Sequence, residues 1–103
     1  KEYGRLPSLF ASQGYDTALL IDAAVRDTKG RIEDVEAVRK ALRAAKFQSV
    51  RGAFKFNTNG YPIQDFYLTK VAKRPDGKFQ TEIVQKVFEN YGDRYAKDCK
   101  AAK

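Results

Sequence analysis

The 103 residues suit a single domain, and a hydrophobic content of 43% with thirteen Phe and Tyr residues argues against a disordered chain. The longest apolar run, Ala18 to Ile21, is four residues long, far short of the ~20 residues that cross a bilayer. The net charge of +7 permits a nucleic-acid partner, but acidic residues lie among the basic ones and no run of five like charges occurs.

Cysteine and histidine usage limits the possible chemistry. Cys99 is the only cysteine and there is no histidine, so the chain can form neither an intrachain disulfide, nor a Cys–His nucleophile pair, nor a Cys/His zinc site. Acid–base catalysis would depend on carboxylates, lysines or tyrosines, and no GxSxG or GxxxxGK[ST] motif is present. An enzyme is disfavoured, and no metal or other cofactor is expected.

A first helix is predicted from Leu9 to Val25. Residues Lys1–Pro7 are interpreted as the end of an earlier element and a short loop, and Ser8 is the candidate N-cap. Apolar residues recur at helical spacing, whereas Asp16 falls with the polar residues. Gly30 is the expected first residue beyond the helix end, the C′ position.

A second helix is predicted from Asp34 to Ala45. Val35, Val38 and Leu42 form a narrow apolar stripe at i, i+3 and i+7, and charged residues cover the opposite face. The pattern is typical of a helix that packs one side against a neighbour.

A hairpin is predicted next. Apolar and polar residues alternate from Val50 to Phe56, as in a half-buried strand. The segment 57–60, Asn-Thr-Asn-Gly, tolerates positive φ and favours a chain reversal. From Ile63 to Val71 the residues are again aromatic and β-branched, which favours a second strand.

The last third of the sequence permits two interpretations. The segment 74–77, Arg-Pro-Asp-Gly, predicts a turn. After it, residues 78–88 alternate like a strand at Phe79, Thr81 and Ile83, but later apolar residues also fit one helix face. A strand over about Lys78–Val87 is favoured because it pairs easily with its predecessor. Glu89–Lys103 is expected to form a short helix with a frayed basic tail.

Motifs in this chain carry a resemblance to a known family. The stretch SVRGAFKFNTNGYPIQDFYLTKV (residues 49–71) and the earlier SQGYD (residues 12–16) resemble the C-terminal part of ABC transporter solute-binding proteins. The similar group is the branched-chain amino acid (Leu/Ile/Val-binding) type, and the resemblance runs from about Tyr3 to Cys99. Members of that group are several-fold longer. Residues 1–103 are therefore interpreted as one C-terminal piece, with the signal peptide expected in the missing N-terminal part.

The resemblance implies both a fold and a function. The fold would be α/β, the C-terminal piece of a two-lobe type I periplasmic binding protein fold. The full-length protein would capture a hydrophobic or branched-chain amino acid, or a related small aromatic carboxylate, in the cleft between its lobes. Hinge closure around the solute would then favour docking on the ABC permease subunits in the membrane. The implied location is the periplasm.

The resemblance also indicates two site residues. In the family, an aromatic residue five positions before the motif tyrosine faces the ligand's side chain. The motif tyrosine here is Tyr15, itself expected in the core, so the aromatic is Phe10, which could give apolar contact to a hydrophobic ligand. An ordinary core aromatic is an equally good interpretation of Phe10. Gln13 is the nearest polar candidate, although a surface glutamine is the commoner role.

The alternative function is a small basic α+β domain that binds nucleic acid. Phe54, Phe56, Phe66 and Tyr67 could form a base-stacking platform. No RNP-type motif accompanies them, and strand aromatics commonly pack a core, so a core role is favoured and no nucleic-acid partner is expected. A fragment without its partner elements would leave apolar faces exposed, so self-association is expected.

Overall fold

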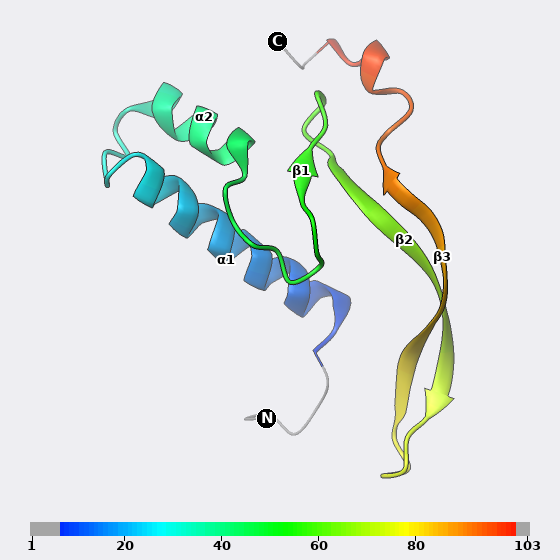
Figure 1. The fold of residues 1–103 in the computed structure, drawn as a ribbon. Coiled ribbons are helices and arrows are strands. Elements are labelled where there is room, and N and C mark those ends of the chain that lie inside the picture. Colours follow the sequence, from blue (N-terminus) through cyan, green and yellow to red (C-terminus); the bar gives the residue numbers. More distant parts are fainter. Residues whose placement is uncertain (1–6, 101–103) are drawn as a thin grey trace.

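The computed structural model describes residues 7–100, so the expectations for residues 1–6 and 101–103 lie outside the described part. Two helices are followed by three strands and a short 3-10 helix (Figure 1). The elements in chain order are α1 (Leu9–Asp27), α2 (Val35–Ala44), β1 (Lys55–Phe56), β2 (Pro62–Lys73), β3 (Phe79–Tyr91) and the 3-10 helix η1 (Ala96–Asp98). No helix within residues 7–100 has the length and apolar character needed to cross a membrane.

Local capping sets both ends of α1. Ser8 Oγ accepts a hydrogen bond from the Ala11 N–H at 3.3 Å, which confirms the predicted N-cap. Lys29 takes the left-handed conformation just after the C-cap, with φ 54°. The Gly30 N–H donates to the Val25 carbonyl at 2.9 Å, as in a Schellman motif. Gly30 is thus the second residue beyond the cap, and its prediction as the first was wrong.

The second helix, α2, is capped by side chain and backbone and packs along α1. Asp34 Oδ1 accepts a hydrogen bond from the Ala37 N–H at 3.0 Å, and Ala45 ends the helix in the left-handed conformation with φ 46°. Ala24 of α1 and Ala41 of α2 are both buried. Small side chains of this kind allow two helix backbones to approach closely, and Leu20, Val38 and Leu42 of the two helices are half-buried beside them.

The three strands form one antiparallel sheet in the order β1-β2-β3. The short β1 pairs with the start of β2, with Lys55 opposite Ile63. The long β2 and β3 pair along their length, from Gln64 opposite Tyr91 to Lys73 opposite Phe79. In Figure 1 these two strands form a twisted ribbon, and β1 lies between the ribbon and the helix pair.

The strand predicted from Val50 to Phe56 is wrong over most of its length, because only Lys55–Phe56 pairs with β2. Upstream, the chain makes a tight turn in which the Gly52 N–H donates to the Ser49 carbonyl at 3.3 Å, with φ 98° at Gly52. The Val50 N–H donates to a carboxylate of α1 at 2.9 Å and is unavailable to a neighbouring strand. A tertiary contact therefore overrides the alternating pattern.

The strand predicted over Lys78–Val87 is confirmed, and the helical alternative is wrong. The strand β3 is longer than predicted and continues to Tyr91. The short helix predicted from Glu89 onward was accordingly wrong at its start, and within the described residues it is limited to the single 3-10 turn at Ala96–Asp98. Pairing with the long β2 strand keeps this segment extended.

The ribbon contains three shifts of register, and one of them is held by Asp65 of β2. Asp65 Oδ1 accepts a hydrogen bond from the Asn90 N–H at 2.8 Å, and Asn90 has the positive φ of 49°. Asp65 Oδ2 also pairs with Lys86 Nζ at 2.7 Å. The side chain thus satisfies backbone that the bulge removes from the ladder.

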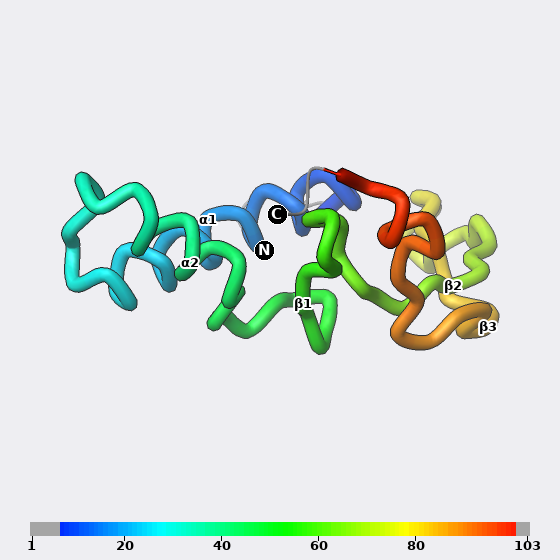
Figure 2. Tube along the Cα trace, turned by 90° about the horizontal axis from the view of Figure 1, so that it is seen from above, coloured from blue at the N-terminus to red at the C-terminus, as the bar shows by residue number. Residues whose placement is uncertain are grey.

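The molecule is open and flat. Its radius of gyration is 17.1 Å, whereas a compact chain of about 100 residues has about 13 Å. Its extents are 51 × 36 × 17 Å, and the view from above shows the thin dimension (Figure 2). The buried apolar residues in the described part are four alanines: Ala24, Ala41, Ala45 and Ala96.

Most of the large apolar side chains face solvent. Tyr15 is 58% exposed, so its expected core position was wrong. Of the four aromatics expected in the core, Phe54 and Phe56 are half-buried and contact each other edge-on, with ring centroids 5.0 Å apart. Phe66 and Tyr67 on the ribbon are each 43% exposed. The core prediction therefore holds only partly, because the ribbon has no layer packed against it within residues 7–100.

Candidate functional site

A buried carboxylate joins α1 to the loop before the sheet. Asp16 lies within α1 and is only 3% exposed. Its Oδ2 accepts hydrogen bonds from the Ser49 hydroxyl at 2.6 Å and from Arg51 Nε at 3.0 Å. Its Oδ1 accepts one from the Val50 N–H at 2.9 Å. One side chain of the helix thereby orders three consecutive residues of a distant loop.

Arg51 extends this connection to the sheet. Its Nη1 donates to Gln64 Oε1 at 3.1 Å, and Gln64 lies on β2. Its guanidinium carbon also lies 5.6 Å from the centroid of the Phe54 ring, within cation–π range. The Arg51 N–H donates to Ser49 Oγ at 3.0 Å, so the serine hydroxyl both donates and accepts. We refer to Asp16, Ser49, Arg51 and Gln64 as the Asp16 cluster.

The surroundings of Asp16 keep its carboxylate ionised. Burial raises the pKa of Asp16, but the hydrogen bonds from Ser49, Val50 and Arg51, with the charge of Arg51, together lower this pKa below its ordinary value of 3.8. Every buried side-chain nitrogen or oxygen in the described residues has a hydrogen-bond partner. A carboxylate fixed by this many donors is suited to holding structure in place.

A hollow of about 280 Å³ lies beside the Asp16 cluster. Gln13 and Thr17 of α1 contribute polar groups to its lining, together with Asp16, Arg51 and Gln64 of the cluster. The apolar part of the lining is formed by Leu20, Phe47, Phe54, Phe56 and Pro62. Apolar walls with a few convergent polar groups are typical of small-molecule sites, although this volume lies just below their usual range of about 300–1,000 Å³.

The structure places the two predicted site residues differently. Both lie in the first two turns of α1. Gln13 borders the hollow beside the Asp16 cluster, whereas Phe10 is not among the residues that line it. The Phe10 side chain is 78% exposed, so the interpretation of Phe10 as a core aromatic does not hold in this chain. Contact of either residue with a ligand stays a prediction.

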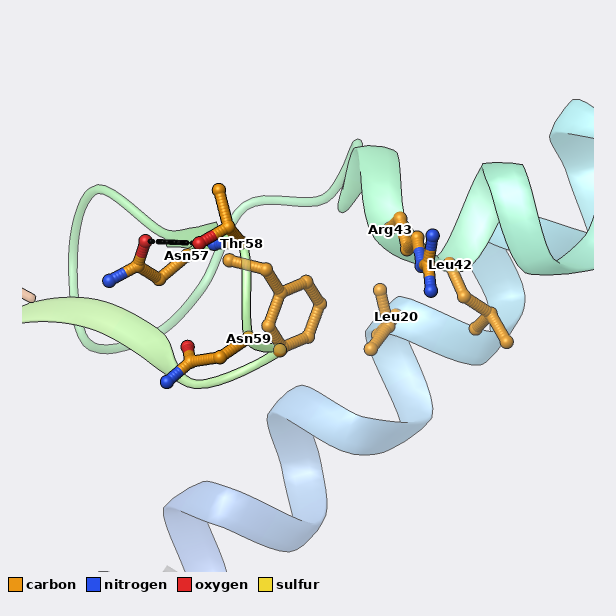
Figure 3. A pocket seen from close by; sticks show the side chains of 8 residues that line it. Leu20, Leu42, Arg43, Asn57, Thr58 and Asn59 are labelled. Carbon is orange, nitrogen blue, oxygen red and sulfur yellow. Dashed lines mark hydrogen bonds between the residues drawn. The ribbon is translucent and has the colours of Figure 1, made fainter. Parts of the chain in front are cut away.

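A second hollow, of about 560 Å³, opens between the helices and the loop that joins β1 to β2. Figure 3 shows Leu20 of α1, with Leu42 and Arg43 of α2, across from the loop residues 57–59. Its lining comes from three separate segments, and no sequence pattern indicates it. The wall nearest the helices is mainly apolar, and the loop supplies amide and hydroxyl groups.

Sequence reasoning missed the Asp16 cluster. Helical periodicity places Asp16 with the polar residues of α1, yet it is among the most buried of residues 7–100. The available signal was its position in the GYD motif together with Arg51 in SVRG, both of which belong to the resemblance. A charged residue that belongs to such a motif is a candidate for a tertiary ion pair.

The described residues offer little to a catalytic or metal site. No group of three or more His, Cys, Asp or Glu side chains converges within residues 7–100. The thiol of Cys99 is exposed and free. Asp16 is paired with Arg51 at 3.0 Å and shielded from solvent. The geometry therefore favours a binding or structural role over chemistry.

Comparison with known proteins identifies the family. Residues 1–78 match the family described as periplasmic binding protein. The fold is similar to that of an ABC transporter substrate-binding protein from Sphaerobacter thermophilus, with a TM-score of 0.74 and 28% identity, and the match covers 86% of this chain and 24% of that one. Comparison with curated proteins finds no match. The predicted fold class is confirmed, since two helices and an antiparallel three-stranded sheet match part of such a fold, and the chain belongs to the periplasmic binding protein family.

Proposed function

We propose that this chain forms the C-terminal part of a periplasmic solute-binding protein that serves an ABC transporter. The family match over residues 1–78 carries the proposal, and the likeness to an ABC transporter substrate-binding protein supports it. Proteins of these two kinds bind solutes and are not enzymes, which agrees with the expected lack of a catalytic role. The protein would deliver its solute to permease subunits in the membrane.

The proposed solute is a hydrophobic or branched-chain amino acid, or a related small aromatic carboxylate. Phe10 offers an aromatic ring at the start of α1, and its exposure of 78% leaves the ring available for contact. Gln13 follows three residues later on the same side of the helix and can both donate and accept hydrogen bonds. An apolar contact next to an adaptable polar group suits an amphipathic solute of this class.

The proposed mechanism is closure of two lobes around the solute. A solute shifts the open and closed populations only if it binds the closed form more tightly. Contacts between the solute and the first turns of α1 would supply part of this difference in affinity if they form only on closure. The permease would then recognise the closed form, so that the binding protein captures and delivers the solute without changing it chemically.

Thermal unfolding of the natural protein that carries this chain tests the proposal. The panel comprises aliphatic amino acids, aromatic amino acids and aromatic acids. A solute present at one hundred times its Kd should add about 2.7 kcal/mol to the free energy of unfolding. One chemical group should raise the midpoint temperature. No shift with any of them, combined with salt-sensitive binding to DNA or RNA, would contradict the proposal and favour the basic-domain alternative.

A pair of variants tests the proposed contact. Phe10→Ala should weaken binding of the identified solute about tenfold or more, because about 1.4 kcal/mol of lost contact has that effect. Ile21→Ala is the matched control, since Ile21 is a 53% exposed apolar residue about three turns further along the same helix. Equal effects of the two substitutions on the Kd would contradict a role of Phe10 in binding.

A further inference from the structure

The N-terminal half of α1 is attached to the rest of the described chain mainly at one point. Among residues 7–100, the side-chain hydrogen bonds that connect this half to the loop and sheet are all made by the Asp16 carboxylate. The C-terminal half is attached separately, by its packing along α2 and by the ion pair of Asp27 with Lys46 at 2.9 Å. Phe10 and Gln13 lie on the freer side of this attachment, six and three residues before Asp16.

We propose that Asp16 and Arg51 are positioning residues for the solute site: they set the direction of the first two turns of α1, and so determine affinity and selectivity without contacting the solute. This inference rests on the proposed function. It adds to the function a pair of residues that hold Phe10 and Gln13 in place.

The geometry of the cluster makes it suitable for this role. The carboxylate accepts hydrogen bonds through both oxygens, and the guanidinium continues to Gln64 on β2, so the direction of the helix is fixed in relation to the sheet. Arg51 is partly shielded, with 27% of its side chain exposed, and is held at the same time by the Phe54 ring. Loss of the Asp16 charge would leave the half-buried guanidinium of Arg51 without its partner.

A small change in the direction of α1 would displace Phe10. Six residues of helix separate it from Asp16, or about 9 Å at 1.5 Å per residue. A tilt of about 10° about Asp16 would displace this turn by about 1.6 Å, more than the gap of about 0.5–1 Å that already removes a quarter to a half of a dispersion contact. The effect should differ between solutes with large and small side chains, because only the large ones reach far enough to contact the ring.

The test uses Asp16→Asn, with Ser49→Ala as a milder variant that keeps both charges and removes only the serine hydroxyl's hydrogen bonds. The control is Asp22→Asn, which removes an exposed ion pair with Arg26 on the same helix, 2.8 Å long. Two quantities are measured in the natural protein that carries this chain: the ratio of Kd values for a large and a small solute, and the orientation of α1 relative to β2 from residual dipolar couplings.

Asp16→Asn should weaken binding of the large solute about tenfold and change the ratio, and it should rotate α1 relative to β2. Ser49→Ala should act in the same direction by a smaller factor, and Asp22→Asn should change neither quantity. A merely structural cluster would lower stability while the folded molecules kept both the Kd ratio and the helix orientation, and that result would overturn the inference. If the unmodified protein binds no solute, the proposed function itself is wrong and the inference falls with it.

Discussion

Replacement of Asp16 by alanine should be among the most damaging single substitutions in this chain. The change removes three hydrogen bonds of 2.6, 2.9 and 3.0 Å to an ionised group, and it leaves the guanidinium of Arg51 without its partner. Removal of one member of a buried ion pair costs about 3–5 kcal/mol. Because 27% of the Arg51 side chain is exposed, water can solvate part of its charge, and the loss should lie near the lower limit, about 3 kcal/mol.

Urea unfolding followed by far-UV circular dichroism measures this loss. The matched control is Asp22→Ala, which breaks an ion pair whose two side chains are 78% and 52% exposed. Exposed i, i+4 pairs contribute about 0.3–0.5 kcal/mol, so the control should unfold nearly as the unmodified chain does. A loss for Asp16→Ala of less than about 1 kcal/mol, close to that of the control, would refute the claim that the cluster holds α1 to the sheet.

Three further predictions concern acid, packing and association. The pKa of Asp16 in the folded state lies below its ordinary value of 3.8, so the stabilisation from the Asp16 carboxylate is complete above that pH and is lost as the pH falls through the folded-state pKa. The urea midpoint should therefore decrease between pH 5 and pH 2, and a constant midpoint would contradict the pairing of Asp16. Gly92→Ala should destabilise by about 1 kcal/mol, because a Cβ there would lie 3.0 Å from Asn57 Nδ2 and 3.3 Å from Ile63 Cγ1 and both side chains would have to shift. Gly14→Ala meets nothing within 4 Å and should stabilise the helix by about 0.5–1 kcal/mol; urea unfolding measures both changes, and equal effects of the two substitutions would contradict the prediction. The 103-residue chain should show a mass that rises with concentration in sedimentation equilibrium, and Val71→Lys on the ribbon, where Val71 is 71% exposed, should reduce this association; a monomer at all concentrations would contradict the prediction.

The elements that the sequence predicted well are those determined by neighbouring residues. The Ser8 cap and the apolar repeat of α1 each depend on residues three or four positions apart in the sequence. The turn at 74–77 likewise directly joins the two strands that pair on either side of it. These signals do not depend on the rest of the fold. The helix ends at Asp27 instead of the predicted Val25. Its C′ residue is Lys29 instead of the predicted Gly30, because Lys29 adopts a left-handed conformation that a sequence pattern assigns more readily to glycine.

The loop before β1 shows why the remainder was not predictable. Its alternation is that of a strand, but Val50 donates its N–H to Asp16, 34 residues away in the sequence. A local sequence pattern cannot show a contact between residues so far apart in the sequence. The same reason explains why Asp16 was expected among the solvated residues of its helix although it is 3% exposed.

The candidate site was predicted only in part. Phe10 and Gln13 were derived from the resemblance, and the structure places both on α1. The hollow beside Gln13 depends on side chains from α1, the loop after α2 and β2, which converge only after folding. Sequence spacing carries no information about such convergence unless a motif already relates the segments.

Because the buried apolar residues of the described part are all alanines, unfolding should expose little additional apolar surface. The heat-capacity change of unfolding and the denaturant dependence both scale with the surface that unfolding exposes, and much of the large apolar surface of this chain is exposed before unfolding begins. The isolated chain should therefore show a heat-capacity change well below the usual value of about 1.2–1.5 kcal/mol/K for 100 residues, together with a broad transition. If other parts of the proposed full-length protein cover the ribbon, the transition should sharpen, and its steepness would measure how much of the β2–β3 surface is covered.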